Sequence, residues 1–204
     1  MSAPKLAAIR RTPVQERSND TVNHILAAAS SLLVATPLEQ ITTSLIAREA
    51  GVSIGGLYRF FPDKQSIIDA IAVRHVEELQ ESLTNSLLAA DVSDARGFLN
   101  LVIDAYVAFL DARPDFRTIA LGRHVSELTK QTQAAPDAGP AALVKLFVLA
   151  QTGKEDSPEL DLKMRIAIET GERLIAYAYE QPDRIQRDRV IAQMKTLLAG
   201  YLLT

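Results

Sequence analysis

The sequence predicts an all-α protein, with a small N-terminal bundle of helices followed by a larger helical domain. Apolar residues recur with the period of a helix along most of the 204 residues, and no segment shows the alternation of a strand. Prolines fall near the starts and boundaries of the helical segments, where the ring is tolerated. The length allows one or two domains, and 48% hydrophobic residues argue against disorder except at the ends.

The first helix is predicted to follow a basic arm. Residues 1–17 are polar and basic, and we expect a flexible arm that either has no binding role or contacts a nucleic acid through its arginines. From about Asp20 to Ala35, apolar residues recur at helical spacing, which predicts a helix with one apolar face. The residues of that face are Val22, Ile25, Leu26, Ala29, Leu32 and Leu33.

Two short helices joined by a sharp turn are predicted for residues 42–64. Thr42 and Ser53 are good N-caps, because a hydroxyl accepts a hydrogen bond from the amides of the first helical turn. Gly51 suits the turn, because glycine adopts a positive φ without strain. The second helix should end at about Phe61, because the proline that follows disfavours helical backbone before it. Two such helices, followed by aromatic and basic residues, are typical of a helix-turn-helix that binds DNA.

This segment resembles the helix-turn-helix of the TetR family of bacterial one-component regulators. The likeness is dense from about Val22 to Ile68 and rests elsewhere on length and helical character. Two positions depart from the family pattern. Gly56 stands where a hydroxyl is usual, and Pro37 stands where a glycine usually follows the first helix. The matching residues are Ile46, Ala47, Arg48, Glu49, Ala50, Gly51, Val52, Ser53, Gly55, Leu57, Tyr58, Arg59, Phe60, Phe61, Pro62 and Lys64.

The resemblance and the chemistry of these residues together predict how the segment contacts DNA. The first short helix should lie at the groove edge, and the second should enter the major groove, where its two glycines permit a close approach. Ile54 suits a thymine methyl group, and Arg59 suits either a guanine or a phosphate. Tyr58 and Lys64 resemble the family's phosphate contacts, and Arg48 either contacts a phosphate or pairs with an acid. The predicted DNA-binding residues are Thr42, Thr43, Arg48, Ser53, Ile54, Gly55, Gly56, Tyr58, Arg59 and Lys64.

The remaining chain is predicted to be helical. A helix from about residue 63 to residue 88 is long enough to leave the N-terminal bundle and enter the next domain. After a break near 91–96, the expected helices span 93–112, 114–122, 124–134, 139–152, 157–180 and 184–203, with loops at 131–140 and 153–157. We therefore expect three parts, namely a flexible basic arm at 1–17, a helix-turn-helix DNA-binding domain at 18–64 and a helical effector-binding and dimerisation domain at 65–204.

The last two helices are predicted to form a dimer interface. Their apolar faces would also suit intramolecular core, but TetR-like regulators dimerise through paired C-terminal helices, and a single helix-turn-helix makes few base contacts. A homodimer predicts an inverted-repeat operator, with half-sites about one helical turn apart, ~34–36 Å, or somewhat more. The predicted interface residues are Ile168, Ile175, Val190, Met194, Leu197, Leu198 and Tyr201.

The resemblance also implies that the C-terminal domain binds a small effector. Such a molecule, apolar or amphipathic, would shift the long central helix and so change the affinity for DNA. Polar and aromatic residues within apolar helices are the candidates, although many of them would equally suit core or surface positions. The predicted effector-binding residues are Tyr106, Phe109, Phe116, His124, Phe147, Glu169, Arg173 and Tyr177.

Composition and spacing exclude several other classes of function. The chain has no cysteine, which excludes disulfides and thiolate metal sites, and its three histidines lack the spacing of metal ligands. No apolar run is long enough for a bilayer and no signal peptide is recognisable, so we expect a cytoplasmic protein. Residues 1–64 carry a net charge of +2 and the remainder −5, which suits a protein that turns one end toward DNA. We expect no enzymatic activity, no metal and no cofactor.

The predicted function is that of a sequence-specific DNA-binding transcriptional regulator, a repressor released from a palindromic operator by a small-molecule effector. Repression and release are implied by the resemblance. Two alternatives remain open, a dimeric DNA-binding regulator without an effector and a helical small-molecule carrier that has lost DNA binding. A cavity in the C-terminal domain would separate the first two, and failure to bind DNA at low salt would favour the carrier.

Overall fold

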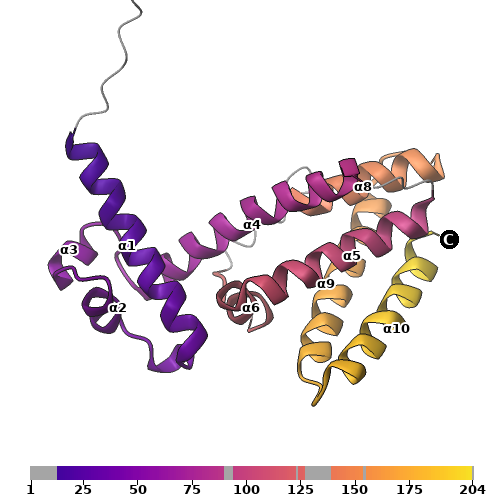
Figure 1. Ribbon diagram of the computed structural model, residues 1–204. Coiled ribbons are helices and arrows are strands. Elements are labelled where there is room, and N and C mark those ends of the chain that lie inside the picture. Colours follow the sequence, from indigo (N-terminus) through magenta and orange to yellow (C-terminus); the bar gives the residue numbers. More distant parts are fainter. Residues whose placement is uncertain (1–12, 90–93, 123, 127–138, 154, 204) are drawn as a thin grey trace, which may run out of the picture. The chain divides into compact units, whose positions relative to one another are not determined.

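The computed structural model describes residues 13–89, 94–122, 124–126, 139–153 and 155–203, and this part of the chain is helical without a strand, which confirms the all-α class. None of the described helices combines the length and apolar character needed to cross a membrane. The chain divides into two compact units, Met1–Ile67 and Ile68–Thr204. The helices are α1 (Pro13–Ala35), the 3-10 helix η1 (Leu38–Gln40), α2 (Thr43–Glu49), α3 (Ile54–Tyr58), α4 (Lys64–Ala89), α5 (Ala95–Ala112), α6 (Pro114–Leu121), α8 (Gly139–Thr152), α9 (Pro158–Tyr179) and α10 (Arg184–Leu202) (Figure 1).

The first unit packs α1, α2 and α3 around a small apolar core. Ile25 of α1, Ile46 of α2 and Leu57 of α3 are each at most 1% exposed, so every helix contributes a fully buried side chain. The apolar face predicted for α1 is confirmed. Ile25, Leu26, Ala29 and Leu33 are buried, and Val22 and Leu32 are partly buried.

The first helix begins earlier than expected. It starts at Pro13 rather than near Asp20, so the flexible arm expected at residues 1–17 is wrong for residues 13–17. Proline is well suited to the first position of a helix, because its missing N–H would have no partner there. Residues 1–12, which include two of the arm's arginines, lie outside the described residues.

The third helix is shorter than expected, because it ends at Tyr58 rather than near Phe61. Beyond it, the amide of Phe60 donates to the carbonyl of Leu57 at 3.0 Å, an i to i+3 bond that tightens the last turn. Glycine occupies two of the helix's five positions, and each glycine weakens a helix by about 1 kcal/mol relative to alanine.

The long helix α4 belongs to both units, because the division falls after Ile67, within the helix. Its start is fixed by a reciprocal cap. The amide of Ser66 donates to the Asp63 carboxylate at 2.7 Å, and the amide of Asp63 donates to the Ser66 hydroxyl at 3.4 Å. The helix expected from residue 63 to residue 88 is therefore confirmed, including its passage from the N-terminal bundle into the next domain.

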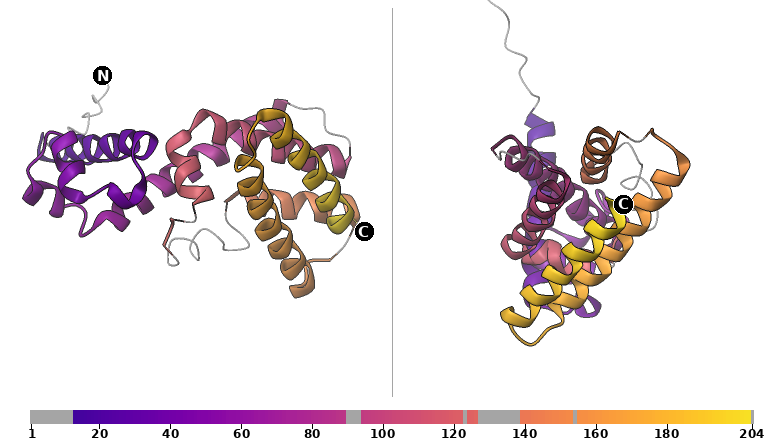
Figure 2. Two further views of the ribbon diagram at one scale, coloured as in Figure 1. Left: turned by 90° about the horizontal axis from the view of Figure 1, so that it is seen from below. Right: turned by 90° about the vertical axis from the view of Figure 1, so that its right-hand side faces the viewer.

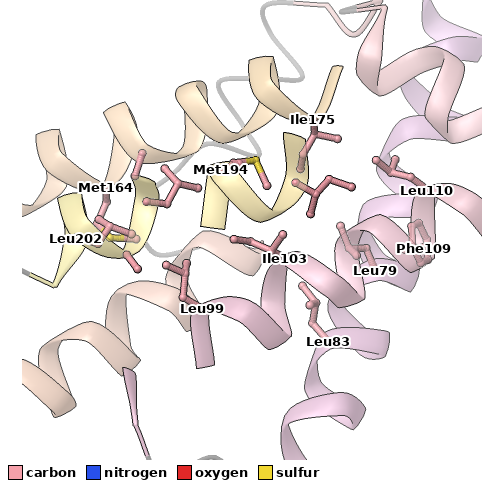
Figure 3. Packing of buried hydrophobic residues seen from close by; sticks show 14 of the residues in the cluster. Leu79, Leu83, Leu99, Ile103, Phe109, Leu110, Met164, Ile175, Met194 and Leu202 are labelled. Carbon is pink, nitrogen blue, oxygen red and sulfur yellow. The ribbon is translucent and has the colours of Figure 1, made fainter. Parts of the chain in front are cut away.

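The second unit surrounds one apolar core, to which α4, α5, α6, α8, α9 and α10 all contribute. Figure 3 shows residues of this core from α4, α5, α9 and α10. Within it, α9 and α10 lie side by side along most of their length (Figures 1 and 2). The most deeply buried residues of this core, each at most 1% exposed, are Leu110, Ala178, Met194 and Ala199.

Most helix boundaries of the second unit follow the predicted signals. Asp94, Ser157 and Asp183 cap α5, α9 and α10 by accepting an amide three residues on. Gly153, which follows α8, has a φ of +63°, as expected for a glycine that ends a helix.

One predicted helix of the second unit differs from the expectation. The helix expected at 124–134 is wrong over residues 124–126, which are irregular, and residues 127–134 lie outside the described residues. The helix expected at 139–152 is confirmed, because α8 spans Gly139–Thr152 and Pro140 stands in its first turn, where it does not interrupt the helix.

Candidate nucleic-acid interface

Two side-chain caps hold α2 and α3 on either side of a sharp turn. The hydroxyl of Thr42 accepts from the amide three residues on at 3.2 Å, and the hydroxyl of Ser53 does the same for α3 at 3.0 Å. Between the helices, Gly51 has a φ of 67°. The caps and the glycine turn predicted from the sequence are confirmed, and together they build a helix-turn-helix.

Helix α3 turns one face into the core and the other to solvent. Leu57 is fully buried, whereas Ile54 is 41% exposed and Tyr58 is 50% exposed. Arg59 follows at the end of the helix, exposed, with its guanidinium 4.7 Å from the ring centroid of Phe60. The side chains predicted to contact bases and phosphates therefore face solvent in this unit.

Tyr58 joins the two helices of the motif. Its hydroxyl oxygen lies 3.0 Å from the hydroxyl oxygen of Thr43, although the residues are 15 positions apart. One hydroxyl donates to the other, so the bonded pair leaves one O–H that can donate to a phosphate. The structure thus brings together two predicted DNA contacts, one from α2 and one from α3.

The two glycines of α3 differ in their surroundings. A Cβ atom built on Gly55 would meet no atom within 4 Å, and Gly55 is exposed. A Cβ atom on Gly56 would lie 3.1 Å from the hydroxyl oxygen of Ser53, the cap of the same helix. The fold therefore gives a reason for glycine at position 56 and none at position 55.

The two basic residues that flank α3 in the motif lie in different settings. The ammonium of Lys64 donates to the carbonyl of Leu38 at 2.9 Å. An ammonium has three N–H donors, so this bond orients Lys64 without using its whole capacity. Arg48 lies exposed in the last turn of α2, where a cation complements the helix dipole.

Among the predicted effector residues, Phe109 and Phe116 lie together inside the second unit. Their ring centroids are 5.7 Å apart in an edge-to-face arrangement, and they are 8% and 4% exposed. The imidazole of His75 packs against both, with centroids 5.3 Å from Phe116 and 6.2 Å from Phe109. These aromatic residues therefore belong to the packed core of the domain.

The other predicted effector residues are dispersed. Phe147 of α8 stacks on Phe98 of α5 with centroids 3.6 Å apart. Tyr106 packs against the core, and burial raises its pKa. His124 is partly buried just beyond α6. The remaining three, Glu169, Arg173 and Tyr177, are exposed on α9.

Two open hollows lie on the described residues, and none of the predicted effector residues lines either one. The hollow in the second unit measures ≈ 390 Å³ and lies beside α6, and the hollow in the first unit measures ≈ 350 Å³ between α1 and the end of α2. Their linings are Arg117, Thr118, Leu121, Gly122, Tyr179 and Arg187 for the first, and His24, Ala27, Ala28, Ser31, Glu49 and Ala50 for the second.

The predicted dimer residues divide into two groups. Ile175, Met194 and Leu198 are at most 5% exposed and fill the core of their own chain, so their assignment to a dimer face needs correction. They occupy the sides of α9 and α10 that face inward, which periodicity alone could not separate from an outer face. Val190 is partly buried against the same core. The outer group consists of Ile168, Leu197 and Tyr201, which are 37%, 51% and 36% exposed.

Sequence reasoning missed a carboxylate that joins four helices. Asp111, at the end of α5, accepts from both terminal nitrogens of Arg187 at 2.9 and 3.2 Å and from the hydroxyl of Tyr179 at 2.7 Å. Arg117 of α6 lies 3.8 Å away. Burial lowers the pKa of Arg187, but its bonds with Asp111 outweigh this and raise it.

Sequence reasoning also missed a buried polar pair between α4 and α6. Nε2 of His75 lies 2.9 Å from Oδ2 of Asp115, and the two residues are 5% and 8% exposed. The partners are 40 positions apart, so no local pattern could pair them. The available signal was a polar residue within the apolar face of each helix.

Two family models cover most of the chain. The model of bacterial regulatory proteins of the tetR family matches residues 25–71, which include α2 and α3. The model of the tetracyclin repressor-like C-terminal domain matches residues 93–204, more than half of the chain.

Individual relatives agree with these matches. The nucleoid occlusion factor SlmA of Shewanella baltica is 31% identical over 101 residues, which are 48% of this chain and 49% of that protein. The chain therefore spans about half the length of the curated relatives it matches. A TetR-family transcriptional regulator from Streptomyces coelicolor is 28% identical with a TM-score of 0.69, over 89% of this chain and 97% of that one. RolR in complex with resorcinol has the same fold, at 16% identity and a TM-score of 0.65, over 93% of this chain and 94% of that one.

Proposed function

Because this chain belongs to the TetR family, it is a DNA-binding transcriptional regulator, and we propose that it acts as a homodimeric repressor on an inverted-repeat operator. The observation that carries the proposal is the solvent-exposed face of α3. That face presents Ile54, Gly55 and Tyr58 outward while Leu57 anchors the helix in the core.

In this proposal, the exposed face of α3 enters the major groove. Ile54 would contact a thymine methyl group, and Arg59 would donate to a guanine or a phosphate. The paired hydroxyls of Thr43 and Tyr58, together with the ammonium of Lys64, would donate to the phosphates that set the position of the helix. Phosphate contacts supply affinity for any duplex, and base contacts supply the preference for one sequence.

The homodimer is supported by apolar side chains that α9 and α10 leave exposed. Burial against a second copy would remove them from water, at about 25 cal/mol per Å² of apolar area. This face differs from the one predicted from periodicity, because Ile175, Met194 and Leu198 lie inside their own chain. The proposed interface residues are Leu162, Ile166, Ile168 and Tyr177 of α9 and Leu197 and Tyr201 of α10.

The repressor would be released by a small apolar or amphipathic effector that enters the second unit. Two aromatic clusters of its interior, Phe109 with Phe116 and Phe98 with Phe147, would accept an apolar ring if they separated. RolR, which has the same fold, is described as a complex with resorcinol, so this fold accommodates a small phenol in that protein.

A second candidate is a dimeric DNA-binding protein that needs no effector. It is favoured by one observation, namely that the aromatic residues proposed to line a pocket are packed against one another and line neither open hollow. In this case the second unit would serve dimerisation alone.

Selection of bound duplexes from a random DNA pool, followed by sequencing, tests the proposed function. An enriched palindrome, together with a dimer in sedimentation, would support the homodimeric repressor. No enrichment by a folded, dimeric chain would reject it and favour a small-molecule carrier. Screening small phenols and other apolar compounds for release of the selected operator then separates the two candidates, because an effector-independent protein would release it with none of them.

A further inference from the structure

Helix α4 is tied to the junction of α5 and α6 by a chain of polar side chains, which we call the α4 polar seam. It consists of His75 and Glu78 on α4, Arg113 at the junction and Asp115 in the first turn of α6. Nε2 of His75 lies 2.9 Å from the Asp115 carboxylate, and Nε of Arg113 donates to the Glu78 carboxylate at 3.2 Å. The seam thus makes two polar links from one helix to a single turn of the chain.

The inner link of the seam lies among apolar groups. His75 and Asp115 are 5% and 8% exposed, and the imidazole packs against Phe109 and Phe116. The short contact between Nε2 of His75 and Oδ2 of Asp115 is a hydrogen bond that gives each of these buried polar atoms a partner. Because water is largely absent there, a displacement of α6 along α4 would break a hydrogen bond between buried polar groups, which is costly in a core.

The outer link is partly exposed and joins the inner one. Oε2 of Glu78 accepts from Arg113 and lies 3.3 Å from Nδ1 of His75, so a single carboxylate oxygen contacts both residues. Burial opposes the ionisation of Glu78, but the hydrogen bond from Arg113 and the interaction with His75 outweigh it and lower the pKa. Hydrogen bonds need a fixed length and direction, whereas apolar contacts tolerate sliding, so the seam specifies one register of α4 against the junction.

The same helix has a polar anchor in the first unit. Lys64, the first residue of α4, donates to the carbonyl of Leu38 at 2.9 Å. Lys64 precedes His75 by about three helical turns of continuous backbone. One hydrogen-bonded helix is therefore held by directed bonds at both ends of this stretch, on the DNA-binding side and in the second unit.

We propose that the α4 polar seam positions the helix-turn-helix for operator binding, with His75 and Asp115 as positioning residues that never contact DNA. The inference rests on the proposed function, because it concerns the separation of two helix-turn-helix motifs in a dimer. With the seam intact, α4 keeps one register and the dimer favours one half-site spacing. Without it, α4 samples more positions, so operator binding must select among them, and the preference for one spacing weakens.

The test uses the full chain and compares the wild type with His75→Ala, Asp115→Ala and the double variant. Each protein is titrated with the selected operator and with operators that are one base pair shorter or longer between the half-sites. We expect the double variant to bind the operator about tenfold more weakly, and its discrimination between spacings to fall by about threefold or more. A change in spacing preference would not follow from a loss of stability alone.

Tyr179→Phe provides the matched control. It also removes a hydrogen bond between helices of the second unit, the 2.7 Å bond to Asp111 between α9 and α5, but it leaves α4 untouched. It should lower the unfolding midpoint and leave the spacing preference unchanged. If the His75→Ala and Asp115→Ala variants do not fold, Glu78→Gln can be tested instead. It weakens the partly exposed outer link and should also reduce the discrimination between half-site spacings.

The outcomes separate the inference from the proposed function. A wild-type chain that enriches no palindrome rejects the proposed function, and the inference falls with it. A wild type that binds its operator, alongside folded seam variants that keep the wild-type affinity and spacing preference, overturns the inference alone. A loss of spacing preference in Tyr179→Phe as large as in the seam variants would also overturn it.

Discussion

Two glycines stand side by side in α3, and the fold accounts for only one of them. Gly56 leaves room for the hydroxyl of Ser53, which caps the helix at 3.0 Å. Gly55 borders open space, although alanine there would strengthen the helix by about 1 kcal/mol. Because the fold does not need this glycine and its face is proposed to meet DNA, we expect the duplex to approach the backbone closely at Gly55.

Gly55→Ala should therefore have opposite effects on stability and on DNA binding. We expect the unfolding midpoint to stay the same or rise, because alanine favours the helix. We expect operator affinity to fall by about tenfold, because the added methyl group would hold the helix away from the groove. Thermal melts and operator titrations of the same preparations measure both effects, and equal or tighter binding by the variant would contradict the steric role of Gly55.

The exposed side chains of α3 should separate into those that set affinity and those that set sequence preference. Tyr58→Phe removes one hydroxyl and should weaken binding to all duplexes alike. Ile54→Ala and Arg59→Ala should instead change the preferred sequence, because a side chain that reads a base contributes about 1–3 kcal/mol of discrimination. Repeating the selection with each variant distinguishes the two roles, and a uniform weakening for Arg59→Ala would assign that residue to a phosphate.

At the residue scale, local signals were predictable and long-range pairings were not. The caps Thr42 and Ser53 and the turn at Gly51 follow from the properties of single residues, and all three are confirmed. The bond between His75 and Asp115 joins residues 40 positions apart, and nothing in either local sequence specifies the other. Site residues fixed by backbone chemistry can be found in one sequence, whereas those fixed by tertiary contact need the fold.

At the scale of elements, the position of each helix was predictable more often than the direction of its faces. The spans of α4, α5, α9 and α10 follow apolar periodicity and boundary residues. The inward sides of α9 and α10 were mistaken for a dimer face, because an apolar side chain such as Met194 suits a core and an interface equally well. Only the packing of the two helices within the chain decides which side remains outside.

The link between α4 and the α5–α6 junction should depend on pH. The pKa of Glu78 is lowered in the folded chain, so its ionised form stabilises the fold above the pKa of the unfolded state, and this contribution disappears as the pH falls through the folded pKa. Glu78→Gln should therefore lower the unfolding midpoint at pH 7, and this effect should shrink as the pH falls below the unfolded value of 4.5 toward about pH 3. Thermal melts of both proteins between these values test the sign, and a difference that grows on acidification would contradict it.

At the scale of the whole molecule, the two units hold different shares of the proposed function. The first unit carries the contacts to DNA, and the second carries the surface that would pair two copies and so set the separation of two α3 helices. One α3 offers few side chains to the bases, so a monomer should discriminate weakly between sequences. We therefore expect operator recognition to depend on residues of α9 and α10 that contact no DNA.

Leu197→Glu tests this dependence. Leu197 is 51% exposed on α10, so a charge is tolerated in the free chain but would be costly if it were buried against a second copy. We expect sedimentation to show a folded monomer and operator affinity to fall by about a hundredfold or more, because the two half-sites would no longer be bound together. Leu146→Glu on α8, at a position 64% exposed and outside the proposed interface, is the matched control and should leave both the dimer and the affinity unchanged. A Leu197→Glu chain that remains a dimer would show that this face does not pair the subunits, and undiminished operator binding by a monomer would show that recognition does not require two copies.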